Sequence, residues 1–265
     1  MPFKQVGSLR LYQFESLDQT GLVHAVFTRR GGVSKGRWSS LNVGATVGDD
    51  PDHVRENRRR LLESLGRKTE SVYEVWQVHS ARVIVVDGPR SDAQIEKADA
   101  MVTDDARVTL LMRFADCVPI LLHDQVRRAI GIAHAGWLGT TRKVAAELVR
   151  TMKREYGCDP KNMRAAIGPS IARHHYEVGP EVEQAVQQAF GKQAQKHLRY
   201  KNGRIYLDLW SANQALVESE GVSQIEVSGL CSACALDDWY SHRGEDGKTG
   251  RFGVAIALRH DDGSD

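Results

Sequence analysis

The sequence predicts an α+β fold in which helices cover layered sheets, and three observations support this prediction. Segments with strand composition alternate with amphipathic helical segments along the 265 residues, with few long breaks. Strand segments such as TLLMRF and PILL show little period-two alternation, which is typical of strands covered on both faces. The composition, 41% hydrophobic and 26% charged residues, is that of a globular protein. We therefore expect one domain over residues 1–265, with sheets inside and helices outside.

The first predicted elements are a strand over residues 21–28 and a helix, separated by a loop rich in glycine and serine over residues 29–44. Asp49 or Asp50 can cap this helix, and Pro51 fits its first turn. The apolar stripe of the helix consists of Val54, Leu61, Leu62 and Leu65.

Strand segments dominate the middle of the chain. Two strands are expected between Val72 and Val86, meeting near Ser80 and Ala81. Four more are expected over residues 100–103, 108–114, 117–123 and 129–135. The clearest helix of the sequence follows, because apolar side chains recur at helical spacing and Gly157 ends the pattern. These side chains are Val144, Leu148, Met152 and Tyr156, with Ala145 and Val149 beside them.

The last hundred residues are expected to continue in the same style. The predicted elements are strands over 163–168, 223–228 and 252–258 and helices near 180–190 and 208–219. A polar stretch over 191–204 could separate two domains. The stretch is short, however, and the apolar segments beside it look only half-covered, so one domain is the interpretation we adopt.

Charge and cysteine content exclude several classes of protein. The formal net charge is +2, from 36 Lys and Arg against 34 Asp and Glu, so no long-range field favours nucleic acid or a membrane surface. No signal peptide and no apolar run of membrane-spanning length is recognisable, so a cytoplasmic location is expected. Disulfides are not expected in such a chain. Its four cysteines are Cys117, Cys158, Cys231 and Cys234.

Three residues interrupt strand-like runs with polar chemistry: His79 in VWQVHSARVIVV, Cys117 in ADCVPILL and His134 in GIAHAGW. Because side chains alternate along a strand, we expect His79 to share a face with Gln77, and His134 to share one with Ile132. Two imidazoles and a thiolate are three ligands that zinc accepts, with a fourth position open for water or substrate. The spacing alone also allows ordinary buried core residues.

The segment HAGWLGTT leads from a predicted strand into the strongest helix, with Thr140 or Thr141 as a possible cap. Backbone N–H groups at such a helix start suit a phosphate group. An ordinary strand-to-helix loop is the alternative. Four arginines could add positive charge for the same anion: Arg29, Arg30, Arg55 and Arg58.

A series of short motifs resembles, in order, one known family, the laccase-domain proteins. The motifs are TRRGGVS (28–34), SLNVG (40–44), VRENR (54–58), WQVHS (76–80), ADCVPILL (115–122), HAGWLGT (134–140), AAIGPSI (165–171), YEVG (176–179), YSHR (240–243) and GRFG (250–253). They extend over nearly the whole chain. Proteins of this family were first called multicopper polyphenol oxidases and are now described as zinc-dependent purine nucleoside phosphorylases.

The resemblance implies a fold, an activity and a site. The fold would be an α/β/β/α sandwich related to bacterial toxin deamidases that use a Cys-His pair. The activity would be phosphorolysis of adenosine, inosine, guanosine and S-methyl-5'-thioadenosine, with deamination of adenosine, so the partners would be a purine nucleoside and phosphate. The zinc ligands and catalytic residues would be His79, Cys117 and His134. The substrate-binding residues would be Asn42, Arg55 and Gln77.

Three positions depart from the family pattern. Leu138 stands where Arg usually follows HAGW, which removes a cation from the expected anion-binding loop. Ser170 stands where Cys is usual, so no essential thiol chemistry is expected there. Ser232 replaces a frequent Thr in CSAC (231–234); this motif hints at half a zinc ribbon, but the chain contains no second CxxC.

Two alternative functions remain open from the sequence. Cys117 could be the nucleophile of a hydrolase or amidase with His79 or His134 as its base. A copper-dependent polyphenol oxidase is a weaker alternative, because the ten histidines include no His-x-His pair and the His174–His175 pair lies in a polar loop segment. Copper nonetheless remains possible as the bound metal. The sequence does not identify a general acid: Asp116 adjoins Cys117, but its side chain is expected on the opposite strand face.

Overall fold

The computed structural model describes residues 2–18, 21–90 and 94–259 of the chain. These residues form five α-helices and three sheets, a mixed α+β fold as predicted. The α-helices are α1 (Pro51–Ser64), α2 (Trp137–Thr141), α3 (Val144–Tyr156), α4 (Pro180–Phe190) and α5 (Leu209–Ser219). The 3-10 helices are η1 (Glu15–Leu17), η2 (Gly36–Trp38), η3 (Thr69–Ser71), η4 (Pro160–Asn162), η5 (Arg173–His175) and η6 (Gly191–Lys196). Within the described ranges, no helix has the length and apolar character that crossing a membrane requires.

The first sheet joins the two ends of the chain. Its strand order is β1 (Phe3–Val6), β2 (Leu9–Tyr12), β3 (Leu22–Phe27), β15 (Phe252–Leu258), β7 (Thr109–Phe114) and β4 (Val72–Tyr73). The last strand of the chain, β15, is antiparallel to both β3 and β7, so it lies in the middle of the sheet.

The second sheet contains most of the strands that flank the candidate site. Its strand order is β14 (Gln224–Val227), β10 (Met163–Ile167), β8 (Val118–Asp124), β9 (Ala129–Ala135), β6 (Ala100–Thr103) and β5 (Val83–Val85). Strands β8 and β9 form an antiparallel hairpin in which Val118 pairs with Ala135 and Pro119 pairs with His134. This register brings the start of β8 next to the end of β9.

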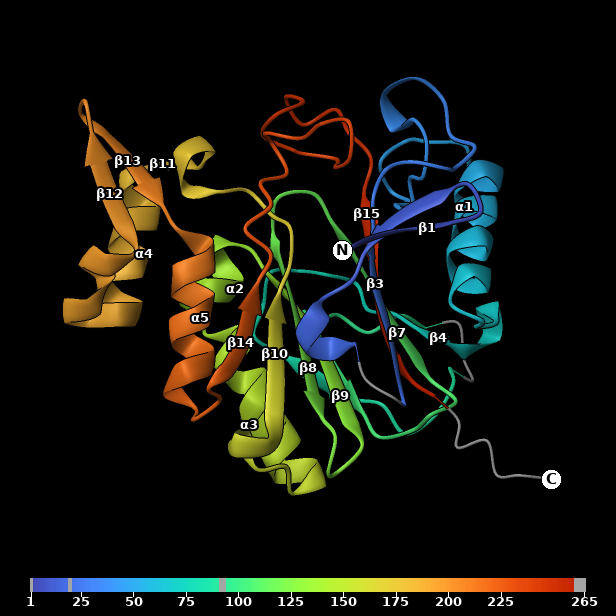
Figure 1. The fold of residues 1–265 in the computed structure, drawn as a ribbon. Helices are drawn as coiled ribbons and strands as arrows, with labels where there is room; N and C mark the ends of the chain where they lie inside the picture. Colours follow the sequence, from blue (N-terminus) through green and yellow to red (C-terminus); the bar gives the residue numbers. More distant parts are fainter. Residues whose placement is uncertain (1, 19–20, 91–93, 260–265) are drawn as a thin grey trace.

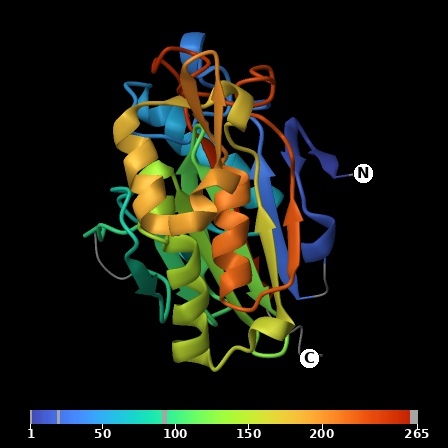
Figure 2. The same ribbon diagram turned by 90° about the vertical axis from the view of Figure 1, so that its left-hand side faces the viewer.

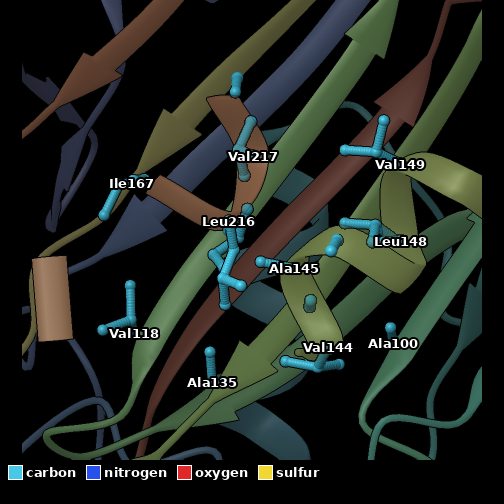
Figure 3. Packing of buried hydrophobic residues seen from close by; sticks show 14 of the residues in the cluster. Ala100, Val118, Ala135, Val144, Ala145, Leu148, Val149, Ile167, Leu216 and Val217 are labelled. Atoms are coloured by element: carbon cyan, nitrogen blue, oxygen red, sulfur yellow. The ribbon is translucent and has the colours of Figure 1, made fainter. Parts of the chain in front are cut away.

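The two large sheets face each other, with helices on their outer sides (Figure 1). Side chains of β7 and β15 meet those of β8 and β9 in a buried core between the sheets. Helix α1 packs Leu61 and Leu62 against the outer face of the first sheet. Helices α3 and α5 cover the second sheet, and Figure 2 shows them in front of its strands. Their contacts include Leu148 of α3 and Leu216 and Val217 of α5 (Figure 3).

Most predicted elements are present within a residue or two of their expected ends. The cap of α1 is Asp50, whose side chain accepts a hydrogen bond from the backbone N–H of Asp52 at 2.8 Å, and Pro51 is the first helical residue. Helix α3 ends at Gly157, which adopts a left-handed conformation with φ of 63°. Here local sequence and tertiary structure agree, because caps and apolar periodicity act within a few residues.

The prediction of two strands meeting near Ser80 and Ala81 is wrong. Strand β4 belongs to the first sheet and β5 to the second, so residues 74–82 cross from one sheet to the other. The apolar pattern of VWQVHSARVIVV resembles a strand, but this segment is held by contacts to both sheets. Gln77 donates a hydrogen bond to the Arg113 carbonyl oxygen of β7 at 2.8 Å, and the Arg82 carbonyl oxygen accepts one from the Ala100 N–H of β6 at 3.2 Å.

The polar stretch over 191–204 contains structure that the sequence analysis did not predict. It forms η6, strand β12 (Leu198–Lys201) and the turn into β13 (Arg204–Leu207). Strands β12 and β13, together with β11 (Glu177–Val178), make a small third sheet. Asn202 and Gly203 both have positive φ, which is the requirement of a tight hairpin turn.

Candidate functional site

The three residues singled out by the sequence come together in the fold. His79, Cys117 and His134 each offer a metal-binding atom, and these atoms all lie within 4.8 Å of one another. The Cys117 Sγ lies 3.9 Å from His79 Nε2, and the two imidazole rings are 5.0 Å apart between centroids. The fold therefore brings together three residues that are far apart in the sequence.

Each residue comes from a different local structure. His134 lies near the end of β9, and Cys117 immediately precedes β8, so the hairpin register places them side by side. His79 lies in the crossing segment over residues 74–82. The expectation that His79 projects from a strand ladder is wrong, because its backbone is left-handed with φ of 59°. Arg142 donates a hydrogen bond to the His79 carbonyl oxygen at 2.6 Å and helps to hold this conformation.

Asp99 organises the cluster, although the sequence analysis did not single it out. It is fully buried just before β6, and its Oδ1 lies 3.0 Å from His134 Nδ1. Its Oδ2 accepts hydrogen bonds from the backbone N–H groups of Val78 and Ser80, at 3.1 and 2.6 Å, which flank His79. One carboxylate thus fixes the His134 ring and the His79 loop together. The local signal is an acidic residue directly before AMVT, a short and mostly apolar strand.

The charges of the cluster favour an ionised thiol. Burial alone would raise the pKa of Cys117, but the charge of His134 and hydrogen bonds from both imidazoles lower it overall. Burial would likewise lower the pKa of His134, but Cys117 and Asp99 raise it overall. The pKa of Asp99 falls to about 2 despite its burial, because His134 and Ser80 donate hydrogen bonds to it. A thiolate is the form of cysteine that binds a metal or acts as a nucleophile.

The donor set fits a zinc ion with one open position. Asp99 engages Nδ1 of His134, which leaves Nε2 for the cluster, an arrangement common for metal-binding histidines. A side chain at Gly136 would not fit, because its Cβ would lie 2.8 Å from the Cys117 Sγ. Three protein ligands beside an open cavity correspond to the ligand count of catalytic zinc sites.

The cluster lies in the wall of a cavity of about 520 Å³, a size typical of small-molecule sites. Its wall also contains the aromatic side chains of Trp76, Trp137 and Tyr176. A second cavity of about 610 Å³ lies between α4 and α5, and no cluster of metal-binding side chains lines it among the described residues. The combination of cavity and metal-binding atoms favours the first as the functional site.

Three arginines bring positive charge to this cavity: Arg113, Arg243 and Arg251. Arg113 forms an ion pair with Glu74 at 3.5 Å and donates a hydrogen bond to the Val75 carbonyl oxygen at 2.9 Å. Burial lowers the pKa of Arg251, and the nearby Cys117 and Asp116 oppose that effect, so its guanidinium lies within the field of the cluster. Arg243 is exposed, and its guanidinium lies over the Tyr176 ring, 5.4 Å from the ring centroid.

Asp116 also lines the cavity, and its contacts differ from those expected of a strand residue. Its φ is 85°, so it precedes β8 in a bend rather than occupying the opposite face of the strand. Its carboxylate accepts hydrogen bonds from the Ser232 and Ser241 hydroxyls and from the Arg243 N–H, at 2.6, 2.7 and 2.6 Å. Asp116 directly precedes Cys117, and its hydrogen bonds therefore link the segments around Ser232 and Ser241 to the cluster.

Of the three substrate-binding residues that the resemblance implies, Gln77 lines the cavity, where its amide bonds to the Arg113 backbone. Asn42 is fully buried and does not line it; its Oδ1 accepts the N–H of Arg251 at 2.8 Å. Arg55 does not line it either, but lies exposed on α1, paired with Asp52.

The other three arginines expected to supply positive charge for an anion form ion pairs elsewhere. The pairs are Arg29 with Glu245, Arg30 with Asp238 and Arg58 with Glu74.

The HAGWLGTT segment contains a short helix of its own before α3, which the sequence did not predict. Helix α2 spans only Trp137–Thr141, and Lys143, with φ of 64°, separates it from α3. Thr140 does not cap α3: its hydroxyl is buried and accepts a hydrogen bond from Asn213 at 2.9 Å. Gly136 and Trp137 of this segment line the cavity, and phosphate binding by its backbone N–H groups stays a prediction.

Comparison with known proteins agrees with the motif resemblance. The family model described as multi-copper polyphenol oxidoreductase laccase matches residues 23–259. The chain is 39% identical over 241 residues to a purine nucleoside phosphorylase of Deinococcus radiodurans, covering 91% of this chain and 90% of that protein. It is 34% identical over 232 residues to adenosine deaminase RL5 of an unknown prokaryotic organism, covering 83% and 88%. The crystal structure of YlmD from Geobacillus stearothermophilus matches with a TM-score of 0.89 at 33% identity, covering 98% of this chain and 99% of that one.

Proposed function

The chain belongs to the multi-copper polyphenol oxidoreductase laccase family, and from this premise we propose that it is a zinc-dependent purine nucleoside phosphorylase. The substrates would be adenosine, inosine, guanosine or S-methyl-5'-thioadenosine, together with phosphate. The observation that carries the proposal is the convergence of His79, Cys117 and His134 in the wall of a cavity that also contains arginines. The Deinococcus radiodurans relative bears the name of this activity.

In this proposal His79, Cys117 and His134 hold zinc, and Asp99 keeps the His134 ring in place. A zinc ion with an open position supplies Lewis-acid chemistry when bound. Copper is an alternative metal, because imidazole and thiolate ligands suit it as well. The ligand count and the closed hydrogen-bond network around Asp99 support zinc as the first choice.

Phosphate would be bound by Arg243 and Arg251. Each donates from Nη1 to backbone carbonyl oxygens: Arg243 to Glu177, and Arg251 to Thr249 and Gly250. A guanidinium carries five N–H donors, so both retain donors for an anion. Asn42 would act through Arg251, because it accepts the backbone N–H of that residue. Holding phosphate in line with the sugar carbon lowers the barrier by orientation and charge stabilisation.

The nucleoside would stack its base against the aromatic side chains of the cavity wall, with Gln77 as a polar contact. Trp137 is the first residue of α2, and Tyr176 lies under the Arg243 guanidinium. Aromatic faces with a few polar groups are typical of sites that bind flat heterocycles.

Adenosine deamination is a second candidate activity at the same site. The relative named adenosine deaminase supports it, as does a metal-binding cluster open to a cavity. Zinc deaminases of nucleobases use a carboxylate to move protons. Asp116 is a carboxylate in the cavity wall, but all of its described contacts are hydrogen bonds that it accepts from neighbouring loops. It therefore serves here as an anchor in our proposal.

The alternative of a Cys117 hydrolase or amidase rests on the same geometry. Cys117, His134 and Asp99 form a chain of thiol, imidazole and carboxylate, and the lowered pKa of Cys117 suits a nucleophile. A relationship of the layered sandwich to toxin deamidases with a Cys-His pair stays a prediction, and it motivates this alternative. The two readings differ in their need for metal and phosphate.

The deciding experiment follows inosine turnover as released hypoxanthine, with phosphate and zinc varied independently. A phosphorylase gives free base and ribose 1-phosphate at a rate that rises with phosphate and saturates. Chelation and Cys117→Ser should each abolish turnover, and added zinc should restore the chelated wild type but not the variant. Reloading the chelated protein with copper in parallel identifies the active metal. Turnover that ignores both phosphate and zinc would sink the assignment and leave the thiol hydrolase standing.

A further inference from the structure

A second group of metal-binding side chains lies outside the reaction site. His174, His175, Cys231 and Cys234 each offer one donor atom, and the four atoms all lie within 4.8 Å of one another. The CSAC motif by itself is weak evidence for zinc, because the sequence contains no second CxxC. The fold supplies the missing pair from a different part of the chain, as two adjacent histidines.

The parallel pairing of two strands brings the group together. His174 and His175 end η5, which follows β10, whereas Cys231 and Cys234 lie in the turns that follow β14. Strands β10 and β14 are parallel neighbours, so both segments leave the sheet at the same end. A further bridge between Ser170 and Cys231 extends this pairing beyond the strands. This bridge anchors Cys231, and the other three residues lie three to five residues beyond it, the histidines in η5 and Cys234 in the turn after Cys231.

The distances and chemistry fit a tetrahedral zinc ion. Zn–N bonds of about 2.0 Å and Zn–S bonds of about 2.3 Å require donor atoms roughly 3.3–3.8 Å apart. His174 Nε2 lies 3.1 Å from the Cys234 Sγ, already near that separation. The Ala172 N–H donates a hydrogen bond to the Cys231 Sγ at 3.3 Å, a contact that supports a thiolate ligand. Both cysteines are free thiols in a CxxC arrangement.

We propose that His174, His175, Cys231 and Cys234 bind a second, structural zinc ion. Four protein ligands complete a tetrahedron and leave no position for substrate, which is the mark of a structural rather than a catalytic site. Two imidazoles and two thiolates select zinc over harder cations such as Mg²⁺ or Ca²⁺. The proposal depends on these residues alone and does not require the reaction proposed above.

This ion would brace the wall of the reaction cavity. His175 is followed directly by Tyr176, which lines the cavity. Ser232, between the two cysteines, donates its hydroxyl to Asp116 at 2.6 Å, and Asp116 adjoins Cys117. The ion would join both segments at one point and so hold them at a fixed spacing. Its ligands are positioning residues in this sense, because none of them lines the cavity.

The first measurement is metal content of the full-length protein purified with zinc in the medium. The wild type should contain two zinc ions per chain. Cys117→Ser should retain one, and the double variant Cys231→Ser/Cys234→Ser should also retain one. Cys158→Ala is the matched control, since this buried thiol belongs to neither group, and it should retain two. One zinc ion in the wild type that the double variant keeps would overturn the proposal.

A second measurement separates the two sites by spectroscopy and does not depend on activity. Cobalt loaded into Cys117→Ser should give the visible bands of a tetrahedral ion with intense thiolate charge transfer, and the further change Cys234→Ser should weaken both. If Cys231→Ser/Cys234→Ser does not fold, the surface variant His174→Ala/His175→Ala replaces it, with folding checked by circular dichroism. Zinc should also slow the reaction of the exposed Cys234 with a thiol reagent in Cys117→Ser. Absence of thiolate charge transfer, or equal thiol reactivity with and without zinc, would contradict the site.

Discussion

The two histidines of the candidate site share a single supporting carboxylate. Asp99 contacts the His134 ring with one oxygen and the backbone on both sides of His79 with the other. Supporting groups of this kind set the orientation and basicity of metal ligands, and their loss typically weakens metal binding 10- to 100-fold. Asp99 therefore supports two of the three proposed zinc ligands at once without being a ligand itself.

We expect Asp99→Asn to weaken zinc binding by about 10- to 100-fold with the fold retained. Asparagine preserves the size of the side chain but removes the charge that favours the His134 contact. Competition with a chromophoric chelator measures the affinity. Asp124→Asn is the control, because Asp124 is equally buried at the far end of β8 and should not change zinc affinity. Unchanged affinity in Asp99→Asn would show that the histidines are held by other contacts.

At the scale of single residues, the sequence could predict the candidate metal-binding side chains but not the residue that holds them in place. His79, Cys117 and His134 stand out because polar donors interrupt apolar runs. Asp99 does not, because its role depends on the backbone of residues 78–80 folding over it. The group of His174, His175, Cys231 and Cys234 could not be predicted for a similar reason. The two histidines and the two cysteines come together only when β10 and β14 are paired.

At the scale of elements, the packing interface between β9 and α3, called the seam below, fixes the position of the strand that contains His134. Gly131 of β9 faces α3, and a Cβ there would lie 3.0 Å from Leu148 Cδ1 and 3.2 Å from Met152 Sδ. The absence of a side chain lets the helix approach the sheet closely. Figure 3 shows Leu148 and Val149 of α3 at this interface.

Gly131→Ala should destabilise the protein by about 1–3 kcal/mol, because overpacking forces the seam apart. Leu148→Ala should cost about 2–5 kcal/mol through the cavity it leaves. In the double variant the added methyl partly fills that cavity, so the combined loss should be smaller than the sum. Urea unfolding of the four proteins measures this coupling. Strict additivity would show that the two residues do not share the seam.

The elements that the sequence predicted are those whose signals are local. Helix α1 begins at its predicted cap and α3 ends at the predicted Gly157, whereas α3 starts after Lys143 and not after Thr140 or Thr141. The crossing over residues 74–82 was read as strands because its apolar pattern is correct for a strand. Membership in two different sheets is a tertiary property, and no local pattern encodes it. The β12–β13 hairpin had a local signal, the Asn202–Gly203 turn, which the polar composition around it obscured.

At the scale of the whole molecule, the sheet order explains why the chain should fold as one unit. Strand β15, over residues 252–258, lies between β3 and β7, so the first sheet is incomplete until these residues are in place. The core between the sheets contains side chains from both. From this interlocking we infer one cooperative domain, and two-state unfolding is the expected observation.

Two buried histidines make the stability of this unit sensitive to acid. His24 on β3 and His123 on β8 come from the two different large sheets, and burial lowers the pKa of each to about 4. His24 Nε2 accepts the N–H of Phe14 at 2.9 Å, which requires the neutral ring. Asp18 and Glu226 oppose the effect of burial on His24, whereas Lys4 and His123 add to it.

The folded pKa of His24 therefore lies below its unfolded value near 6.5. Between these values the unfolded chain binds a proton that the folded chain excludes, so stability falls as the pH drops. The contribution of neutral His24 to the free energy of unfolding is complete above the unfolded pKa. It is lost as the pH falls to about 4, with an upper bound of about 3 kcal/mol.

His24→Gln keeps an acceptor for the Phe14 N–H and cannot titrate. Urea unfolding of both proteins across this window should show a shallower decline for His24→Gln. Zinc release at low pH affects both proteins alike and cancels in the difference, so parallel declines would mean that His24 is already protonated in the fold.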